Sequence, residues 1–297
     1  MMSNEPLITR INIMGDSLSD AGTMNQNAFM RVASKVSQSP EGKFTNGMVW
    51  SDYLLRNLSN SHGSDNTRDV DSNHHKNKLM EGETVIRSYA IGGATSHETS
   101  ADWNKSIERK LLSSLETERK ELLKDNRKYH VNSDEIKTTL TVEWSGANDI
   151  ATLSSKLENG DLKGAKKQAD RAIEARLHNV EKLIEAGYTN FALFNLPNLA
   201  NTPRFSDKKA KVTNGANEVS HYFNDKLLEG IEALQKNTQV VTFNVLMWIR
   251  NLAKFTQIPK VMVLIPIPNY KPTISFMKVT MFLYLMMMCI HQPKPMR

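Results

Sequence analysis

Three short polar segments, each placed directly after an apolar run, contain the residue types that serine-based ester chemistry needs. They are GDSL at residues 15–18, IGGA at residues 91–94 and GAND at residues 146–149. A serine hydroxyl of ordinary acidity is a poor nucleophile, so catalysis by Ser17 requires a base that takes its proton. It also requires preorganised hydrogen-bond donors for the oxyanion that forms when the serine attacks a carbonyl carbon. The three segments together indicate acyl-transfer chemistry.

Donors for such an oxyanion occur in the same three segments. Gly93 offers a backbone N–H with no side chain to block a substrate, and Asn148 offers a side-chain NH2 group. The backbone N–H of Ser17 is the third donor. Three convergent donors make an oxyanion hole, and the adjacent carboxylates of Asp16 and Asp149 are candidates for a supporting role.

Each segment taken alone also has an ordinary structural interpretation. GDSL suits a turn followed by a helix cap, IGGA suits a tight turn, and GAND suits the end of a strand, since Ser, Asp and Asn favour such positions. All three segments occur in one chain, and each follows an apolar run. This combination favours the catalytic interpretation.

Apolar, β-branched runs that alternate with helical patterns predict the elements that position these segments. Strands are expected at residues 8–14, 84–90, 138–144, 190–196 and 239–243, and helices at residues 49–57, 105–124, 161–186 and 214–235. Strands that alternate with crossover helices form a parallel sheet covered on both faces. The predicted fold class is therefore α/β, a three-layer α/β/α sandwich with a flavodoxin-like five-stranded parallel sheet. Ligands bind outside the carboxyl ends of such strands, so Ser17, Gly93 and Asn148 are expected at one edge of the sheet.

The segment at residues 59–83 is polar and has almost no apolar anchor, which predicts a long surface loop. Two adjacent histidines, His74 and His75, lie in it. No matching third ligand accompanies them, so we expect neither a metal site nor a cofactor.

Six segments make the chain resemble the GDSL, or SGNH, esterases and lipases, in the branch that contains lysophospholipases and glycerophospholipid:cholesterol acyltransferases. They are GDSLSDAG (residues 15–22), FTNGMVWSDYL (44–54), YAIGGATS (89–96), WSGANDI (144–150), FNLPNLANTP (194–203) and VSHYFNDKLLEGIEAL (219–234). The resemblance covers residues 8 to about 243 and depends on the whole set. It implies the SGNH hydrolase fold, with Ser17 as nucleophile and with Gly93 and Asn148 as oxyanion donors. The implied function is a serine esterase or lipase acting on lipid acyl esters, lysophospholipase-like, with acyl transfer as a variant outcome.

The catalytic base that this resemblance implies is absent from its expected place. The family carries an Asp, two further residues and a His near the C-terminus, where the His is the base and the Asp orients it. The last acidic residue of this chain is Glu232, and His291 lies in the string CIHQP with no Asp before it. His291 is the remaining candidate for the base, and it has no carboxylate to set its tautomer.

The genetic code offers an explanation for the missing block. Methionine has a single codon, ATG, so the run MMMCI at residues 286–290 fixes most of its bases. Read one nucleotide earlier, these bases encode Asp, Asp and Val followed by His or Tyr, and the version with His is the missing block. Residues 244–297 also hold seven basic and no acidic residues, and they lack a clear helical or strand period. We therefore infer a frameshift near residues 243–246, with an SGNH hydrolase domain at residues 1–243 and an aberrant tail at residues 244–297.

The net charge of +6 and the pI of about 9.2 ordinarily indicate a polyanionic partner. Here the excess charge comes from the tail, since residues 1–243 hold 31 basic and 32 acidic residues. We therefore expect a lipid or other ester substrate and no nucleic acid. No apolar run is long enough to span a bilayer, so we expect at most transient contact with a membrane surface. The first residues lack a signal-peptide pattern, which predicts a cytoplasmic protein or one exported by a signal-independent route.

Two other functional classes fit parts of the sequence. A catalytically dead lipid- or ester-binding protein would keep the substrate cleft and lose the base, although intact Ser17, Gly93 and Asn148 argue for a recent loss. A membrane anchor would rest on the tail string MFLYLMMMCI, whose ten residues are too few to span a bilayer.

Overall fold

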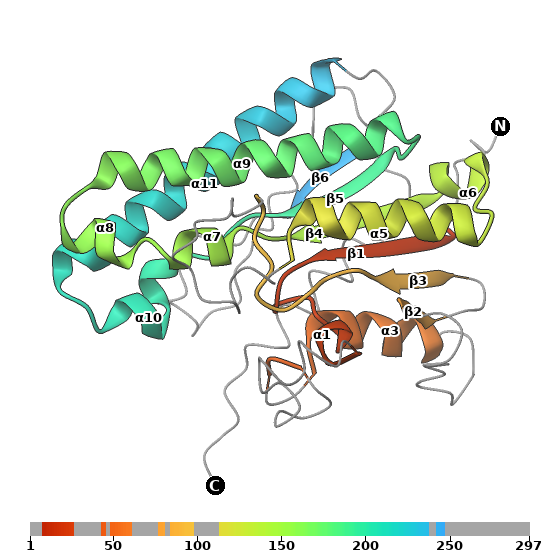
Figure 1. Ribbon diagram of the computed structural model, residues 1–297, viewed down its shortest axis with the longest axis horizontal. Coiled ribbons are helices and arrows are strands. Elements are labelled where there is room, and N and C mark those ends of the chain that lie inside the picture. Colours follow the sequence, from red (N-terminus) through yellow and green to blue (C-terminus); the bar gives the residue numbers. More distant parts are fainter. Residues whose placement is uncertain are drawn as a thin grey trace, which may run out of the picture.

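A β-sheet with helices on both faces forms the body of the protein (Figure 1). The structure is a computed structural model that describes residues 8–26, 43–45, 48–60, 77–80, 84–97, 113–237 and 242–246. Its strands are β1 (Arg10–Gly15), β2 (Lys78–Met80), β3 (Val85–Ser88), β4 (Thr139–Trp144), β5 (Asn190–Phe194) and β6 (Thr242–Leu246). Its helices are α1 (Thr23–Gln26), α3 (Trp50–Asn60), α5 (Leu115–Lys128), α6 (Ser133–Lys137), α7 (Ala147–Ala151), α8 (Ser154–Glu158), α9 (Leu162–Glu185), the 3-10 helix η3 (Leu199–Asn201), α10 (Pro203–Ser206) and α11 (Ala210–Asn237).

The strand order of the sheet is β2-β3-β1-β4-β5-β6. Strand β1 pairs in parallel with β3 on one side and with β4 on the other, and β4, β5 and β6 continue in parallel. The five parallel strands follow the flavodoxin-like order, in which the chain changes direction along the sheet at β1. The predicted α/β sandwich of the SGNH type is therefore confirmed, and each of its five predicted strands is present.

The sixth strand, β2, was not expected from the sequence. It pairs antiparallel with β3 at the edge of the sheet, with Lys78 opposite Arg87 and an irregular register toward Met80. The sequence analysis placed residues 59–83 in a surface loop. This prediction is wrong at residues 59–60, which end helix α3, and at residues 78–80, while residues 61–76 and 81–83 lie outside the described residues. A three-residue edge strand needs few apolar side chains, so a polar composition does not exclude it.

Helix α5, the first described helix after β3, begins later than the sequence predicted. Ser114 is the N-cap of α5, with an extended backbone and a side-chain oxygen that accepts a hydrogen bond from the N–H of Thr117 at 3.4 Å. The predicted helix at residues 105–124 is therefore wrong at Ser113 and Ser114, and its residues 105–112 lie outside the described residues. The prediction for α9 is close, because Asp161 caps that helix by accepting from the N–H of Gly164.

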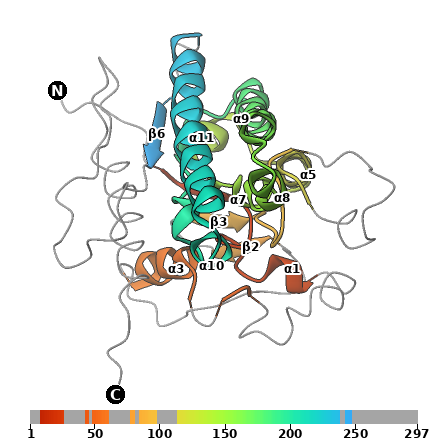
Figure 2. The ribbon, with the colours of Figure 1, turned by 90° about the vertical axis from the view of Figure 1, so that its left-hand side faces the viewer.

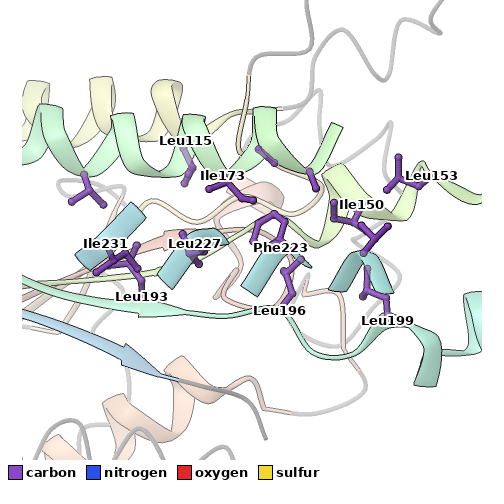
Figure 3. Close-up of a cluster of buried hydrophobic side chains, with 14 of the residues drawn as sticks. Leu115, Ile150, Leu153, Ile173, Leu193, Leu196, Leu199, Phe223, Leu227 and Ile231 are labelled. Atoms are coloured by element: carbon purple, nitrogen blue, oxygen red, sulfur yellow. The ribbon is translucent and has the colours of Figure 1, made fainter. Parts of the chain in front are cut away.

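Two apolar cores lie on opposite faces of the sheet. Helices α5, α9 and α11 cover one face, and their side chains pack with Leu193 of β5 and with the loops that follow β4 and β5 (Figure 3). Helix α3 covers the other face, where Trp50 and Leu54 pack on Ile13 of β1 and on other strand residues. Figures 1 and 2 show the resulting three layers. No helix among the described residues has both the length and the apolar character needed to cross a bilayer.

Candidate active site

The carboxyl ends of β1, β3 and β4 lie next to one another, because β1 is the strand between the other two. The N–H of Asp16 donates to the carbonyl of Trp144 at 3.2 Å, and the N–H of Ile91 donates to the carbonyl of Gly15 at 3.0 Å. These bonds continue the sheet pairing past the strand ends. They join the three polar segments that contain Ser17, Gly93 and Asn148, so the structure brings these segments to one edge of the sheet.

Gly15 is required for the close approach of the first segment to β4. Its φ is +133°, and a Cβ atom at this position would lie 2.0 Å from the carbonyl oxygen of Trp144. Any other residue would have to push β1 and β4 apart. The turn that follows is short, since the carbonyl of Asp16 accepts from the N–H groups of Ser19 at 2.9 Å and Asp20 at 3.0 Å.

Ser17 lies in this turn and is partly exposed, between the buried Asp16 and the exposed Leu18. Its place fits a nucleophile, because a serine at a tight turn after a strand is open to a substrate above the sheet edge. The N–H of Leu18 donates to Asp16 Oδ1 at 3.0 Å, which holds the backbone on both sides of the serine.

Asp20 ties the first polar segment to the second. Its carboxylate accepts hydrogen bonds from the N–H of Gly92 at 2.7 Å, of Gly22 at 2.8 Å and of Thr23 at 2.6 Å. The carboxyl is fully buried, and burial raises its pKa although these hydrogen bonds oppose the rise. The turn that presents the N–H of Gly93, whose φ is +80°, is thereby fixed to the turn that presents Ser17.

Asn148 lies in the first turn of α7, directly after Gly146 and Ala147, and is partly exposed. Its Nδ2 donates to the carbonyl of Ala94 at 2.8 Å. A primary amide carries two N–H groups, so one remains for an oxyanion. The bond to Ala94 also places the amide beside the residue that follows Gly93.

Asp149, which follows Asn148, has a fully buried side chain. Its Oδ2 accepts from the N–H of Ser96 at 2.8 Å, and its Oδ1 lies 2.6 Å from Nδ1 of His97. These bonds tie Asp149 to the segment of Gly93, and the supporting role of Asp149 stays a prediction. The sequence analysis missed His97, because it is 52 residues from Asp149 and no motif links the two.

A buried polar network lies below the site and joins α9 to it. Arg176 of α9 donates from Nε to Glu143 Oε2 at 2.8 Å and from Nη2 to the carbonyl of Phe194 at 2.8 Å. Ser145 donates to the other carboxylate oxygen of Glu143, and its Oγ lies 3.0 Å from that of Ser96. The contacts run without a break from α9 to the segment that carries His97.

Two further carboxyl groups are buried at the turn that carries Ser17. Glu118 of α5 accepts from the N–H of Gly15 at 2.8 Å, and burial raises its pKa well above the ordinary value. Burial also raises the pKa of Asp16 from 3.8 to about 7, and the negative charges of Asp149 and Glu143 add to the rise. The Oδ2 atom of Asp16 has no hydrogen-bond partner. Near neutral pH a large fraction of Asp16 is therefore protonated, which reduces the negative charge beside Ser17.

Residues 11–272 match the family described as GDSL-like Lipase/Acylhydrolase. The chain belongs to this family. One curated relative is a phosphatidylcholine-sterol acyltransferase from Aeromonas hydrophila, 27% identical over 245 residues that make up 82% of this chain and 60% of that protein. The chain thus spans less than two thirds of that relative's length. The resemblance inferred from the six sequence segments is confirmed, and so is the prediction that the chain is by family an ester hydrolase or acyltransferase.

A second segment of this GDSL protein lies against the site. The phenyl ring of Phe44 covers Gly92, where a Cβ atom would lie 1.9 Å from the ring. The segment is held by Lys43, whose Nζ is 2.6 Å from Asp52 Oδ1, and the following helix α3 is held by Trp50, whose Nε1 donates to Ser19 Oγ at 3.1 Å. Within the sequence motif at residues 44–54, Phe44 therefore lies at the rim of the site and Trp50 ties α3 to the turn that carries Ser17.

The structure does not describe three histidines that the sequence analysis considered. His291, His74 and His75 lie outside the described residues, as does the tail from residue 247 onward. Within the described ranges, no group of three or more His, Cys, Asp or Glu side chains is arranged to hold a metal ion.

Proposed function

We propose that this protein is a serine ester hydrolase of the lysophospholipase-like kind, acting on lipid acyl esters. Ser17 attacks the acyl carbonyl carbon, and the N–H groups of Ser17 and Gly93 and the amide of Asn148 hold the oxyanion. Asp16 and Asp149 support these groups from below. The observation that carries this proposal is the convergence of the three segments at the carboxyl ends of β1, β3 and β4.

An apolar substrate is favoured by the side chains at the rim. Leu18 and Phe44 are the large apolar side chains that the described part of the chain leaves exposed, at 38% and 41%. Leu18 follows the nucleophile, and Phe44 covers Gly92, the neighbour of Gly93. An exposed apolar patch next to a catalytic group favours contact with an acyl chain, because burying such side chains stabilises a complex by about 25 cal/mol per Å².

The proposal includes an impaired base. Residues 233–297 contain no Asp or Glu, so this sequence supplies no Asp-x-x-His block after Glu232, and a frameshift near residues 243–246 accounts for the loss. Removing the histidine of a serine triad lowers kcat by a factor on the order of 10⁶. We therefore expect the chain to bind and react with acyl groups but to turn them over very slowly. A dead lipid-binding protein is the alternative that the same missing block allows.

The test uses a biotinylated alkyl fluorophosphonate, which forms a covalent bond to an activated serine. The proposal expects slow labelling of Ser17, found by peptide mass spectrometry, and no labelling of the Ser17→Ala variant. Hydrolysis of lysophosphatidylcholine should be negligible in both proteins. If lysophosphatidylcholine binds but Ser17 stays unlabelled both in this chain and in a chain whose reading frame is restored near codon 244, the protein is a binding protein and the catalytic proposal is wrong.

A further inference from the structure

Two donors of the proposed oxyanion hole, the backbone N–H of Gly93 and the side-chain amide of Asn148, lie in two short segments that follow different strands. Gly93 lies in the segment at residues 91–97 after β3, and Asn148 lies at the start of α7 after β4. The two segments are joined by three hydrogen bonds. Asn148 Nδ2 donates to the carbonyl of Ala94, and the carboxylate of Asp149 bonds to the N–H of Ser96 and to Nδ1 of His97.

We propose that His97 is a positioning residue of the oxyanion hole, which fixes Gly93 relative to Asn148 through Asp149. The inference rests on the proposed function, because it takes Gly93 and Asn148 as the oxyanion donors. The contact is short, at 2.6 Å, and the nitrogen donates in it, since a carboxylate has no proton to give. His97 lies four residues after Gly93 and Asp149 lies one residue after Asn148, so the bond acts directly on the spacing of the donors.

Burial strengthens the hydrogen bond between His97 and Asp149. The side chain of Asp149 is 0% exposed and that of His97 is 25% exposed. Loss of the imidazole would remove a donor from a carboxylate oxygen that water does not readily reach, which disturbs the carboxylate and its remaining bond to Ser96. The segment is held on its other side by the residues at the start of α5, because the N–H of Thr95 donates to the carbonyl of Ser113 at 3.1 Å and the N–H of Leu115 donates to the carbonyl of Thr95 at 3.2 Å. Without His97, this side is held by the bonds of Ala94 to Asn148 and of Ser96 to Asp149 and Ser145, and the end of the segment can shift toward α5.

Catalysis is sensitive to such a relaxation. Oxyanion donors act at 2.7–3.1 Å from the developing charge, and a displacement of about 1 Å lowers the rate on the order of 10²-fold. A residue that sets the distance between two donors therefore affects the reaction of Ser17 without touching the substrate.

The test compares three variants of the full 297-residue chain by the rate at which the alkyl fluorophosphonate labels Ser17. His97→Ala removes the donor. His97→Asn keeps it, because Nδ2 of asparagine and Nδ1 of histidine are both attached to Cγ. His178→Ala is the matched control, since His178 is an exposed histidine on α9 whose Nδ1 lies 3.6 Å from Glu181.

We expect His97→Ala to lower the labelling rate about 10- to 100-fold. We expect His97→Asn to retain a rate within about threefold of the unmodified protein and His178→Ala to change nothing, because the donor to Asp149 is kept in both. Equal rates in His97→Ala and the unmodified protein would overturn the proposal. Equal losses in His97→Ala and His97→Asn would also overturn it, because a retained donor to Asp149 would then make no difference to the rate.

A second measurement keeps the inference testable if Ser17 proves unreactive, which would contradict the proposed function alone. Amide hydrogen exchange of residues 91–97 does not depend on ester chemistry. We expect faster exchange at Ser96 in His97→Ala, because its N–H bonds to Asp149, and unchanged exchange in His97→Asn. Unchanged exchange in His97→Ala would mean that His97 does not position this segment.

Discussion

Arg176 of α9 and Glu143 of β4 form an ion pair with both side chains buried, at 0% and 3% exposure, and with Nη2 2.8 Å from Oε2. Glu143 also accepts a hydrogen bond from Ser145, two residues before Ala147 at the start of α7. The pair therefore connects a long helix that covers the sheet with the strand that leads to Asn148. Water does not reach this pair, so each charge is balanced only by its partner. Removing either side chain would leave the other as an uncompensated buried charge.

Replacing one partner of this pair should destabilise the protein strongly. We expect Arg176→Met to lower the free energy of unfolding by about 3 to 5 kcal/mol, because Glu143 would remain buried and unpaired. Lys182→Met is the matched control, since Lys182 lies on the same helix and pairs with Glu185 at 2.7 Å on the surface. Its loss should change stability by less than about 1 kcal/mol. Urea unfolding followed by circular dichroism measures both, and similar effects of the two substitutions would contradict the assignment.

Alanine substitutions at Gly15 and Gly187 should separate the cost of backbone strain from the cost of a steric clash. Both have positive φ, at +133° and +95°, but a Cβ at Gly15 would lie 2.0 Å from Trp144 O, whereas one at Gly187 would lie 3.6 Å from Ile136. Alanine at residue 187 should cost about 1 to 2 kcal/mol for the left-handed backbone. Alanine at residue 15 should cost about 3 kcal/mol or more, because β4 must also move. Thermal unfolding of both variants checks the order, and an equal loss would mean that the first turn is not tightly held against β4.

The five parallel strands were predictable because each is a short run rich in apolar, β-branched or aromatic residues. Strand β4 is buried on both faces of the sheet. Leu140, Val142 and Trp144 pack in the core on the side of α3, and Thr141 and Glu143 point to the side of α9. Strand β2 was not predictable, because three residues at a sheet edge leave no periodic signal. The start of α5 was missed because the helical pattern of apolar residues gave no weight to the cap at Ser114.

The residues of the candidate site also divide into those that the sequence could predict and those that it could not. Ser17, Gly93 and Asn148 could be predicted as site residues from the sequence because each stands in a short local motif that follows an apolar run. The pair of His97 with Asp149 and the pair of Arg176 with Glu143 join residues 52 and 33 positions apart. Contacts of this kind depend on how helices and loops pack on the sheet, and residue types in one sequence do not specify them.

Asp16 should make stability depend on pH in a definite direction. Its pKa is 3.8 in an unfolded chain and about 7 in the fold, so between these values the folded protein retains a proton that the unfolded chain releases. Its contribution to stability is therefore largest below about pH 4, declines as pH rises and is constant above about pH 7. An asparagine at this position cannot ionise, so the advantage of Asp16→Asn over the unmodified protein should grow by about 1 to 4 kcal/mol across this interval. Urea unfolding at about pH 4, 5.5, 7 and 8.5 tests this, and a constant difference would contradict the raised pKa.

Phe44 should favour long acyl chains. Its ring is 41% exposed above Gly92, so an alkyl chain bound at the rim can cover it. We expect Phe44→Ala to lower the ratio of the labelling rates for dodecyl and butyl fluorophosphonates about 3- to 10-fold, because less apolar surface is buried. Ile136→Ala is the control, since Ile136 lies on α6 at the opposite, amino-terminal end of β4. An unchanged ratio for Phe44→Ala would show that Phe44 does not contact the acyl chain.

The last prediction concerns rescue of turnover. In the chain as it stands, residues 244–297 supply His291 but no carboxylate that could orient it, so we expect negligible hydrolysis of p-nitrophenyl butyrate and lysophosphatidylcholine. The proposed frameshift predicts that restoring the reading frame near codon 244 returns an Asp-Asp-Val-His block and raises the rate toward the range of about 1 to 10³ per second that enzymes show. Ser17→Ala in the restored chain should abolish this activity, which excludes a contaminant. If the unmodified chain already hydrolyses these esters in that range and His291→Ala removes the activity, then His291 acts as the base without a carboxylate and the proposed impairment is wrong.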